Sequence, residues 1–345
     1  MKKKQIIILI LLGILILLSS LGISYYKNNE AFIGILFSDA SMEDSELKIL
    51  NENFHNKKSI KSIRLDAMDA PMVSYINNSV YIPTSLDNKL FYINNNFEVS
   101  EQKVDHGSSF IRSKKDGQLI LFNLPRNKIN GDNNRVYFSY NNKKNTLDIE
   151  KSLLLCGDFD NKYIYVIGAK FDSDTNTETY LFIIDRASFK LVKEEKLPTN
   201  IRVICTELID NKLFISSDTK VDYFLYYDIL NKKIEKINYN KLIKNSLDIS
   251  KIVYDENNIF LASLTGDIVK LDRKKLIIND VKTLNDRRII GADIKDNKLY
   301  LLNKDEENRR VAKVNVLDAS TLKQIKEISV GPIRNTMPQD IFIYK

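Results

Sequence analysis

Short runs of β-branched and aromatic residues, separated by polar turns, recur along most of this chain. Runs of about four to eight such residues with alternating polarity predict β-strands. The tripeptide Asp-Asn-Lys stands between two such runs at Asp160–Lys162, Asp210–Lys212 and Asp296–Lys298. Asp and Asn favour tight turns, and a module of about 40 to 50 residues that repeats with such turns is typical of a β-propeller.

The strand positions predict six complete four-stranded units. These units begin near Met72, Ser109, Leu153, Val203, Lys251 and Ile289. A fourth Asp-Asn-Lys, at Asp87–Lys89, falls between the second and third strands of its unit instead of the first and second. The blade register therefore depends on the whole set of strands and not on the tripeptide.

The two ends of the chain complete one more unit. Three strands, at Phe32–Phe37, Glu46–Leu50 and Ile60–Leu65, lack a first strand, and Asp340–Tyr344 is a strand without followers. Pairing the last strand with the first three removes the exposed sheet edges of an open ring. We therefore predict an all-β fold, a seven-bladed β-propeller over residues 32–345 closed by its C-terminal strand, with six or eight blades as the alternatives.

An apolar segment precedes the predicted propeller. Met1 to Lys4 form a basic start, and the 18 residues Ile6–Ile23 contain no charge. Eighteen residues at about 1.5 Å each make a helix of about 27 Å, close to the thickness of a bilayer core. We predict a cytoplasmic stub at 1–5, a transmembrane signal-anchor at 6–24, a linker at 25–31 and a propeller outside the cytoplasm. A cleaved signal and a secreted propeller are the alternative.

The composition agrees with a β-rich globular chain and narrows its partners. The 345 residues are 43% hydrophobic and include 17 Tyr, 16 Phe and no Trp. Aromatic residues suit the half-buried surfaces of strands. The formal charge of +7 falls to +4 beyond residue 30, because residues 1–30 hold four lysines and one glutamate. The remaining charges are spread evenly, so we expect no nucleic-acid partner.

Two cysteines lie on equivalent strands of the predicted propeller. Cys156 is four residues before the turn residue Asp160, and Cys205 is five residues before Asp210. Successive strand residues point to opposite faces, so these two side chains diverge. We expect two free thiols that are buried as small hydrophobes, although export would permit a disulfide.

The last unit carries a repeat pattern that other units show in a weaker form. Val314–Thr321 reads V-N-V-L-D-A-S-T, Ile328–Pro332 reads I-S-V-G-P, and Pro338–Ile341 opens the next strand. The pattern resembles the YVTN-type repeat, and Leu181–Asp185 and Phe224–Asp228 are similar to its strand. The resemblance implies an extracytoplasmic seven-bladed propeller, akin to quinoprotein-like and lactonase-like propellers, some of which are enzymes. The chain departs from the family by lacking most of its Gly and Pro junctions.

The loops indicate where a ligand would bind. Links between blades share one face of a propeller with the second-to-third hairpins, and here that face collects the long insertions. Binding residues favour such loops on a rigid scaffold. Four arginines at or near the start of inner strands would ring the channel mouth on this face and suit a small anionic ligand: Arg112, Arg202, Arg288 and Arg334. Arginines paired with nearby carboxylates, such as Glu207 or Asp293, are the alternative.

Two further features are candidate sites. His106, in Asp105-His106-Gly107, is a candidate ligand-binding residue, although we expect a solvated turn there. One polar hairpin loop alternates oxygen ligands: Asp172, Asp174, Asn176 and Glu178. Thr177 stands where an EF-hand turn needs Gly, so we expect a solvated loop and no cofactor, with calcium as the alternative.

These observations favour a membrane-tethered scaffold that binds a protein partner or a small anionic ligand at the loop-rich face. The sequence contains only two histidines and no compact cluster of catalytic groups, so an enzyme is the less favoured class. A lactonase-like or other hydrolytic enzyme and a surface sensor or adhesion protein remain as alternatives, because propellers host many unrelated activities.

Overall fold

The structure is a computed structural model. It describes residues 32–41, 44–52, 61–104, 106–123, 134–141, 143–171, 177–198, 203–216, 221–239, 242–243, 247–284, 288–304, 308–331 and 335–344. Ile6–Ile23, the predicted transmembrane segment, lies outside these ranges. Within them there is no helix that is long and apolar enough to cross a membrane.

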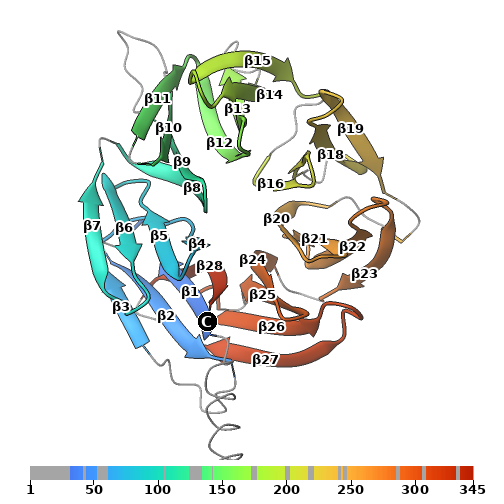
Figure 1. The fold of residues 1–345 in the computed structure, drawn as a ribbon. Coiled ribbons are helices and arrows are strands. Elements are labelled where there is room, and N and C mark those ends of the chain that lie inside the picture. Colours follow the sequence, from blue (N-terminus) through green and yellow to red (C-terminus); the bar gives the residue numbers. More distant parts are fainter. Residues whose placement is uncertain are drawn as a thin grey trace, which may run out of the picture.

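Seven four-stranded antiparallel sheets stand around a central channel (Figure 1). We name them blades A to G and give their strands from the channel outward. Blade A consists of β28 (Met337–Tyr344), β1 (Phe32–Ser38), β2 (Ser45–Asn51) and β3 (Lys61–Leu65). Blade B consists of β4 (Ser74–Ile76), β5 (Ser79–Pro83), β6 (Lys89–Ile93) and β7 (Val99–Lys103). Blade C consists of β8 (Ser108–Lys114), β9 (Gly117–Phe122), β10 (Asn134–Tyr140) and β11 (Lys143–Ile149).

The remaining blades follow the same order from the channel outward. Blade D consists of β12 (Ser152–Phe159), β13 (Tyr163–Phe171), β14 (Thr177–Asp185) and β15 (Lys190–Lys196). Blade E consists of β16 (Thr206–Ile209), β17 (Lys212–Ile215), β18 (Tyr223–Asp228) and β19 (Lys233–Asn238). Blade F consists of β20 (Ile249–Tyr254), β21 (Asn258–Ser263), β22 (Asp267–Asp272) and β23 (Ile278–Thr283). Blade G consists of β24 (Arg288–Lys295), β25 (Lys298–Lys304), β26 (Ala312–Asp318) and β27 (Gln324–Val330).

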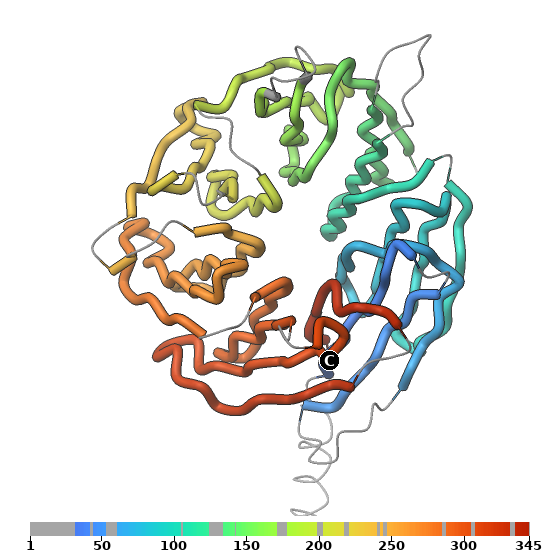
Figure 2. Tube along the Cα trace, turned by 180° about the vertical axis from the view of Figure 1, so that it is seen from behind, coloured from blue at the N-terminus to red at the C-terminus, as the bar shows by residue number. Residues whose placement is uncertain are grey.

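The C-terminal strand closes the ring. Strand β28 pairs with β1, with Ile341 opposite Ile35, so the first and the last described strands share blade A (Figure 2). Gly34 of β1 faces the ring of Phe342, where an added Cβ would come within 2.2 Å of the ring atoms. The predictions of a seven-bladed propeller and of its closure are confirmed. The two alternatives of six and eight blades are wrong.

Some predicted strand limits need correction. The fourth strand of blade B begins at Val99, because Phe97 adopts a positive φ of 61° in the preceding turn. The inner strand of blade E begins at Thr206 and not at Val203. Blade C has the outer strand β11, which the sequence analysis did not locate, because its residues are mostly polar and exposed. Alternation of polarity is a weak signal on a strand with little buried surface.

The Asp-Asn-Lys tripeptide forms two kinds of turn. In blades E and G, Asp and Asn both have positive φ, at 47° and 61° for Asp210 and Asn211, which is the geometry of a two-residue hairpin turn. In blade D, Asp160 Oδ1 instead accepts the N–H groups of Lys162 and Tyr163, each at 2.7 Å. The shared tripeptide therefore marks the position of the turn without determining its geometry.

Blades D to G share a turn that follows the third strand. The last residue of that strand is an aspartate whose Oδ1 accepts backbone N–H groups of the turn. The fourth residue after this aspartate has positive φ. The aspartates are Asp185, Asp228, Asp272 and Asp318, and the positive-φ residues are Phe189, Lys232, Leu276 and Leu322. Hydrogen bonds to these aspartates lower their pKa. This turn explains why an aspartate ends the third strand in each of blades D to G.

Candidate functional site in the central channel

The inner strands of all seven blades contribute to a cavity on the axis of the ring. Its volume is about 670 Å³. Charged and polar side chains reach it from several blades: Arg112 of β8, Glu207 of β16, Lys251 and Tyr254 of β20, Asp293 of β24, and Asp340 of β28. A cavity of this size on a rigid ring is the main candidate site among the described residues.

Arg112 forms the most extensive polar contact in this cavity. Its Nη1 lies 2.9 Å from Glu207 Oε2, and its Nη2 donates to the carbonyl of Thr206 at 2.8 Å. Burial works against the charged guanidinium, but the carboxylates of Glu207 and Asp158 outweigh it and raise the pKa of Arg112. Burial raises the pKa of Glu207, and Arg112 offsets this only in part. The pair thus joins blade C to blade E across the channel.

Two lysines pair with almost fully buried aspartates. Lys114 Nζ lies 2.5 Å from Asp158 Oδ1, and Lys251 Nζ lies 2.9 Å from Asp340 Oδ1. The side chains of Asp158 and Asp340 are only 0% and 4% exposed. Removing one partner of a buried pair leaves an uncompensated charge, which is strongly destabilising. These contacts join blades C and D and blades F and A.

Three aspartates of the inner strands also accept hydrogen bonds from the backbone of the next blade. One carboxylate oxygen of each accepts the N–H of the following residue, and the other accepts an N–H from the neighbouring blade. The neighbouring donors are Leu208 for Asp158, Ile343 for Asp293 and Val73 for Asp340, at 2.8, 2.6 and 3.1 Å. Blades D and E, G and A, and A and B are joined in this way.

Asp293 also has a perturbed carboxyl group in the channel. Burial raises its pKa to about 6, although the N–H groups of Ile343 and Ile294 act in the opposite direction. The nearby carboxylate of Asp340 adds to the increase. An acid with a pKa this close to neutrality, at the wall of a cavity, is a group that could exchange protons with a bound molecule.

The two cysteines are free thiols, as predicted. Cys156 is buried and Cys205 lines the cavity. Burial raises the pKa of Cys205 to about 12 and also raises that of Cys156. Both therefore stay protonated near neutral pH, which makes them poor nucleophiles.

The structure separates the described members of the predicted arginine ring. Arg112 lies two residues before the end of β8, whereas Arg288 is the first residue of β24 and is exposed. All inner strands run in the same direction, so these two residues stand at different heights along the channel. Arg202 and Arg334 lie outside the described residues.

The other candidate residues lie away from the channel. His106 lies between blades B and C and lines a smaller cavity. Glu178 accepts hydrogen bonds from Lys196 and from Tyr180 Oη, the latter at 2.7 Å. Its three partners in the calcium alternative, Asp172, Asp174 and Asn176, lie outside the described residues. Among the residues that the structure describes, there is no group of three or more His, Cys, Asp or Glu that could hold a metal ion.

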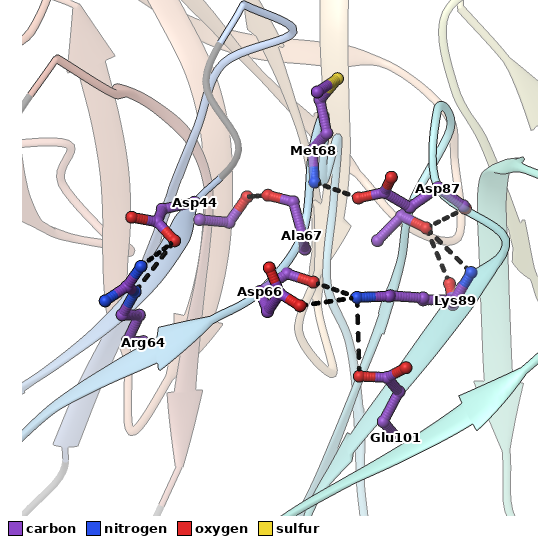
Figure 3. Close-up of polar contacts among 10 residues, drawn as sticks. Asp44, Arg64, Asp66, Ala67, Met68, Asp87, Lys89 and Glu101 are labelled. Carbon is purple, nitrogen blue, oxygen red and sulfur yellow. Dashed lines mark hydrogen bonds and ion pairs between the residues drawn. The ribbon is translucent and has the colours of Figure 1, made fainter.

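The exceptional tripeptide at Asp87–Lys89 belongs to the loop-rich face. Asp87 Oδ2 accepts the N–H of Met68 at 2.5 Å, and Lys89 Nζ donates to Asp66 Oδ2 at 3.0 Å (Figure 3). Glu101 Oε2 lies 3.7 Å from the same Nζ (Figure 3). The tripeptide thereby fastens the link between blades A and B to the second hairpin of blade B. Most of the long insertions on this face lie outside the described residues.

The channel aspartates were missed as a group by the sequence analysis. Each is a single acidic residue within an apolar inner strand, as in Gly157-Asp158-Phe159 and Ala292-Asp293-Ile294. This pattern was a usable signal, because an unpaired carboxylate is rarely buried. Its partners could not be identified, since they come from other blades.

Comparisons with known proteins bear on the fold. No family model matches the chain, and no curated protein matches it. Among solved structures, apo AztD from Citrobacter koseri has a TM-score of 0.53 and 10% identity, with 91% of this chain and 97% of that chain covered. Saccharomyces cerevisiae Sqt1 has a TM-score of 0.59 and 10% identity, with 88% and 86% covered. At this identity the likeness shows that the chain shares their fold.

Proposed function

We propose that this protein is a binding scaffold, a rigid propeller tethered outside the cytoplasm by the segment Ile6–Ile23. The proposal extends the shared propeller fold in the direction that the YVTN-type resemblance implies. Its partner is a protein or a small anionic ligand, and its binding surface is the loop-rich face together with the adjoining mouth of the channel.

The main support for this proposal is that three cationic side chains of the inner strands form ion pairs between blades. Lys114, Arg112 and Lys251 each pair with a carboxylate of another blade. A general acid or base needs freedom to bind and release a proton, whereas these groups are held by strong partners. Their contacts hold the blades together, which is what a rigid scaffold requires.

One observation favours a hydrolytic enzyme as the second candidate. The raised pKa of Asp293, about 6, suits a carboxyl group that transfers protons near neutral pH. Asp293 also holds the N–H of Ile343 in the closing strand, so its position has a structural reason. Hydrolysis is therefore ranked below binding.

Membrane tethering can be tested in intact cells. Leu11→Arg with Leu12→Arg places two charges in the middle of the apolar segment, which should disfavour insertion by several kcal/mol. Leu11→Ile with Leu12→Ile is the matched control. We expect the wild type and the control to sediment with membranes and to be cut by protease added outside the cells. A wild-type propeller found free in the medium would instead establish the cleaved alternative.

Binding can be tested by crosslinking in the same cells. The wild-type chain should capture a defined protein through residues of the loop-rich face, such as Asp66 or Lys89. Crosslinks that map only to the opposite face, or turnover of lactone substrates that Asp293→Asn abolishes, would overturn the scaffold proposal.

A further inference from the structure

A second cavity lies between blades B and C, away from the channel axis. Its volume is about 290 Å³, near the lower end of cavities that hold small molecules. Strands β6 and β7 of blade B form one wall, and β9, β10 and β11 of blade C form the other (Figure 1). Because it lies outside the channel, it is a separate candidate for ligand binding.

The floor of this cavity is apolar and aromatic. Leu90, Ile120 and Phe122 are buried there, at 7%, 3% and 7% exposure. The ring of Tyr137 meets Phe122 edge to face at a centroid distance of 6.3 Å. Such a floor accommodates a ring or a short aliphatic body.

The rim of the cavity is basic. Lys103 of β7 and Lys144 of β11 line it from opposite walls, and both are exposed. Among the described residues, neither lysine forms an ion pair with a carboxylate. Arg135 also lines the cavity, and Asp148 neutralises it through two hydrogen bonds of 2.7 and 3.1 Å. The charged side chains that line the cavity are therefore all cationic, which favours a negatively charged group at the entrance.

Strand alternation keeps the rim and the floor on one face of blade C. Lys144 and Thr146 of β11 line the cavity together with Gln118 and Ile120 of β9. The residue before Lys144, Lys143, is also exposed, but its side chain points to the other face of the strand. Lys143 and Lys144 thus provide two equal charges, one at the cavity and one outside it.

We propose that this inter-blade cavity binds a small amphipathic organic anion. Its aromatic or short aliphatic body packs on Leu90, Ile120 and Phe122, and its carboxylate, sulfonate or phosphate lies between Lys103 and Lys144. His106, which also lines the cavity, stands beside the entrance as a further hydrogen-bonding group. The inference does not depend on the proposed scaffold function.

The test uses the full-length chain in detergent micelles, with 4-fluorobenzenesulfonate as the probe. Binding is measured as broadening of the 19F NMR line of the probe, and micelles without protein are the control. We expect saturable binding at one site. Removing two exposed lysines by Lys103→Ala with Lys144→Ala should weaken it roughly five- to tenfold, as expected for two partly screened charges. Lys143→Ala, which removes the same charge from the opposite face, should change the affinity less than about twofold.

Two further measurements complete the test. The uncharged analogue 4-fluorobenzenesulfonamide should bind wild type about as weakly as the sulfonate binds the double variant. Thr146→Phe places a ring at the entrance on an exposed strand position, where folding should be unaffected, and should abolish binding. Absence of saturable broadening, an equal loss for Lys143→Ala and for the double variant, or equal affinity for the sulfonate and the sulfonamide would each overturn the proposal.

Discussion

Blade C turns one face to blade D and the other to blade B, and the two faces are packed differently. On the side of blade D, Leu119, Leu121, Val136 and Phe138 are buried and belong to one apolar core shared by blades C, D and E. On the side of blade B, the alternate residues include Gln118, Arg135 and Lys144, and a cavity of about 290 Å³ remains. The same strands therefore form a close-packed interface with blade D and a loosely packed interface with blade B. We call such an interface between neighbouring blades a seam.

Arg186 accounts for part of this difference. The Arg186 side chain is 9% exposed, and its guanidinium lies over the rings of Phe138 and Tyr140 at 4.8 and 4.7 Å and pairs with Asp116 at 2.6 Å. It follows the last residue of β14 and thus bridges blade D to the first turn of blade C. Arg273 takes the equivalent place after β22 and pairs with Asp210 in the first turn of blade E. At the corresponding place after β10, facing blade B, stands Asn141. The seam between blades C and D thus combines an apolar core with a cationic bridge, whereas the seam between blades B and C lacks the bridge and leaves a cavity.

The largest expected effect comes from truncating one aromatic side chain on each face. Phe138→Ala should lower the free energy of unfolding by about 4 kcal/mol, because it leaves a new cavity in a close-packed core and exposes Arg186. Phe122→Ala should cost about half as much, because Phe122 already borders a cavity. Denaturant titration of both variants measures the difference. Equal losses would mean that the two seams are packed alike.

The cationic bridge should contribute less than the core. Arg186→Ala should destabilise the chain by about 2 kcal/mol through loss of stacking and of the ion pair with Asp116. Arg186→Lys should recover little, since an ammonium cannot reproduce the planar stacking of a guanidinium. Arg273→Ala, at a more exposed bridge, is the control and should cost about 1 kcal/mol. Thermal unfolding of the three variants can be compared directly, and full recovery by lysine would contradict the role of stacking.

Enlarging a side chain, instead of truncating it, should also distinguish the two faces of blade C. Ile120 and Leu121 are neighbours on β9 and point to blades B and D. Leu121→Phe should cost about 2 kcal/mol, because a filled core must shift to accept the larger ring. Ile120→Phe should change stability by less than about 0.5 kcal/mol, because the ring can enter the cavity. If Ile120→Phe proves as costly as Leu121→Phe, the cavity is not available to a ring.

The smallest effect concerns pH and a third seam, between blades G and A. The pKa of Asp293 is raised to about 6 in the folded chain, so this group binds its proton more tightly when folded than when unfolded. Its stabilising contribution is therefore present at low pH and is lost as pH rises through about 6. The aspartates of the outer turns, whose pKa values are lowered, act with the opposite sign below about pH 4.

This sign can be checked with the melting temperature between pH 5 and 7. We expect Asp293→Asn to remove a decline worth about 1 kcal/mol over this range. Asp158→Asn is the comparison at a seam with a lysine partner and should leave that slope in place, even though it lowers stability overall. A wild-type slope that survives in Asp293→Asn would assign the decline to another group.

The sequence alone was sufficient for the class of fold, the number of blades and the closing strand. These properties depend on local alternation of polarity, as in Leu299–Leu302, and on turn residues, as in Asp296–Lys298. Each of these two signals can be recognised within a few consecutive residues. It also identified the two cysteines as free thiols. It failed to find β11, whose exposed residues carry little alternation.

Only the tertiary structure decided which side chains meet. Arg112 was singled out from the sequence, but its contact with Glu207 joins residues of two blades that are not consecutive in the chain. The partners of Asp158, Asp293 and Asp340 likewise come from other blades, as does each wall of the cavity between blades B and C. The pattern within a strand determines which face of the sheet a side chain occupies. The side chain that it contacts in another blade depends on how whole blades pack around the ring. No local sequence signal encodes that packing.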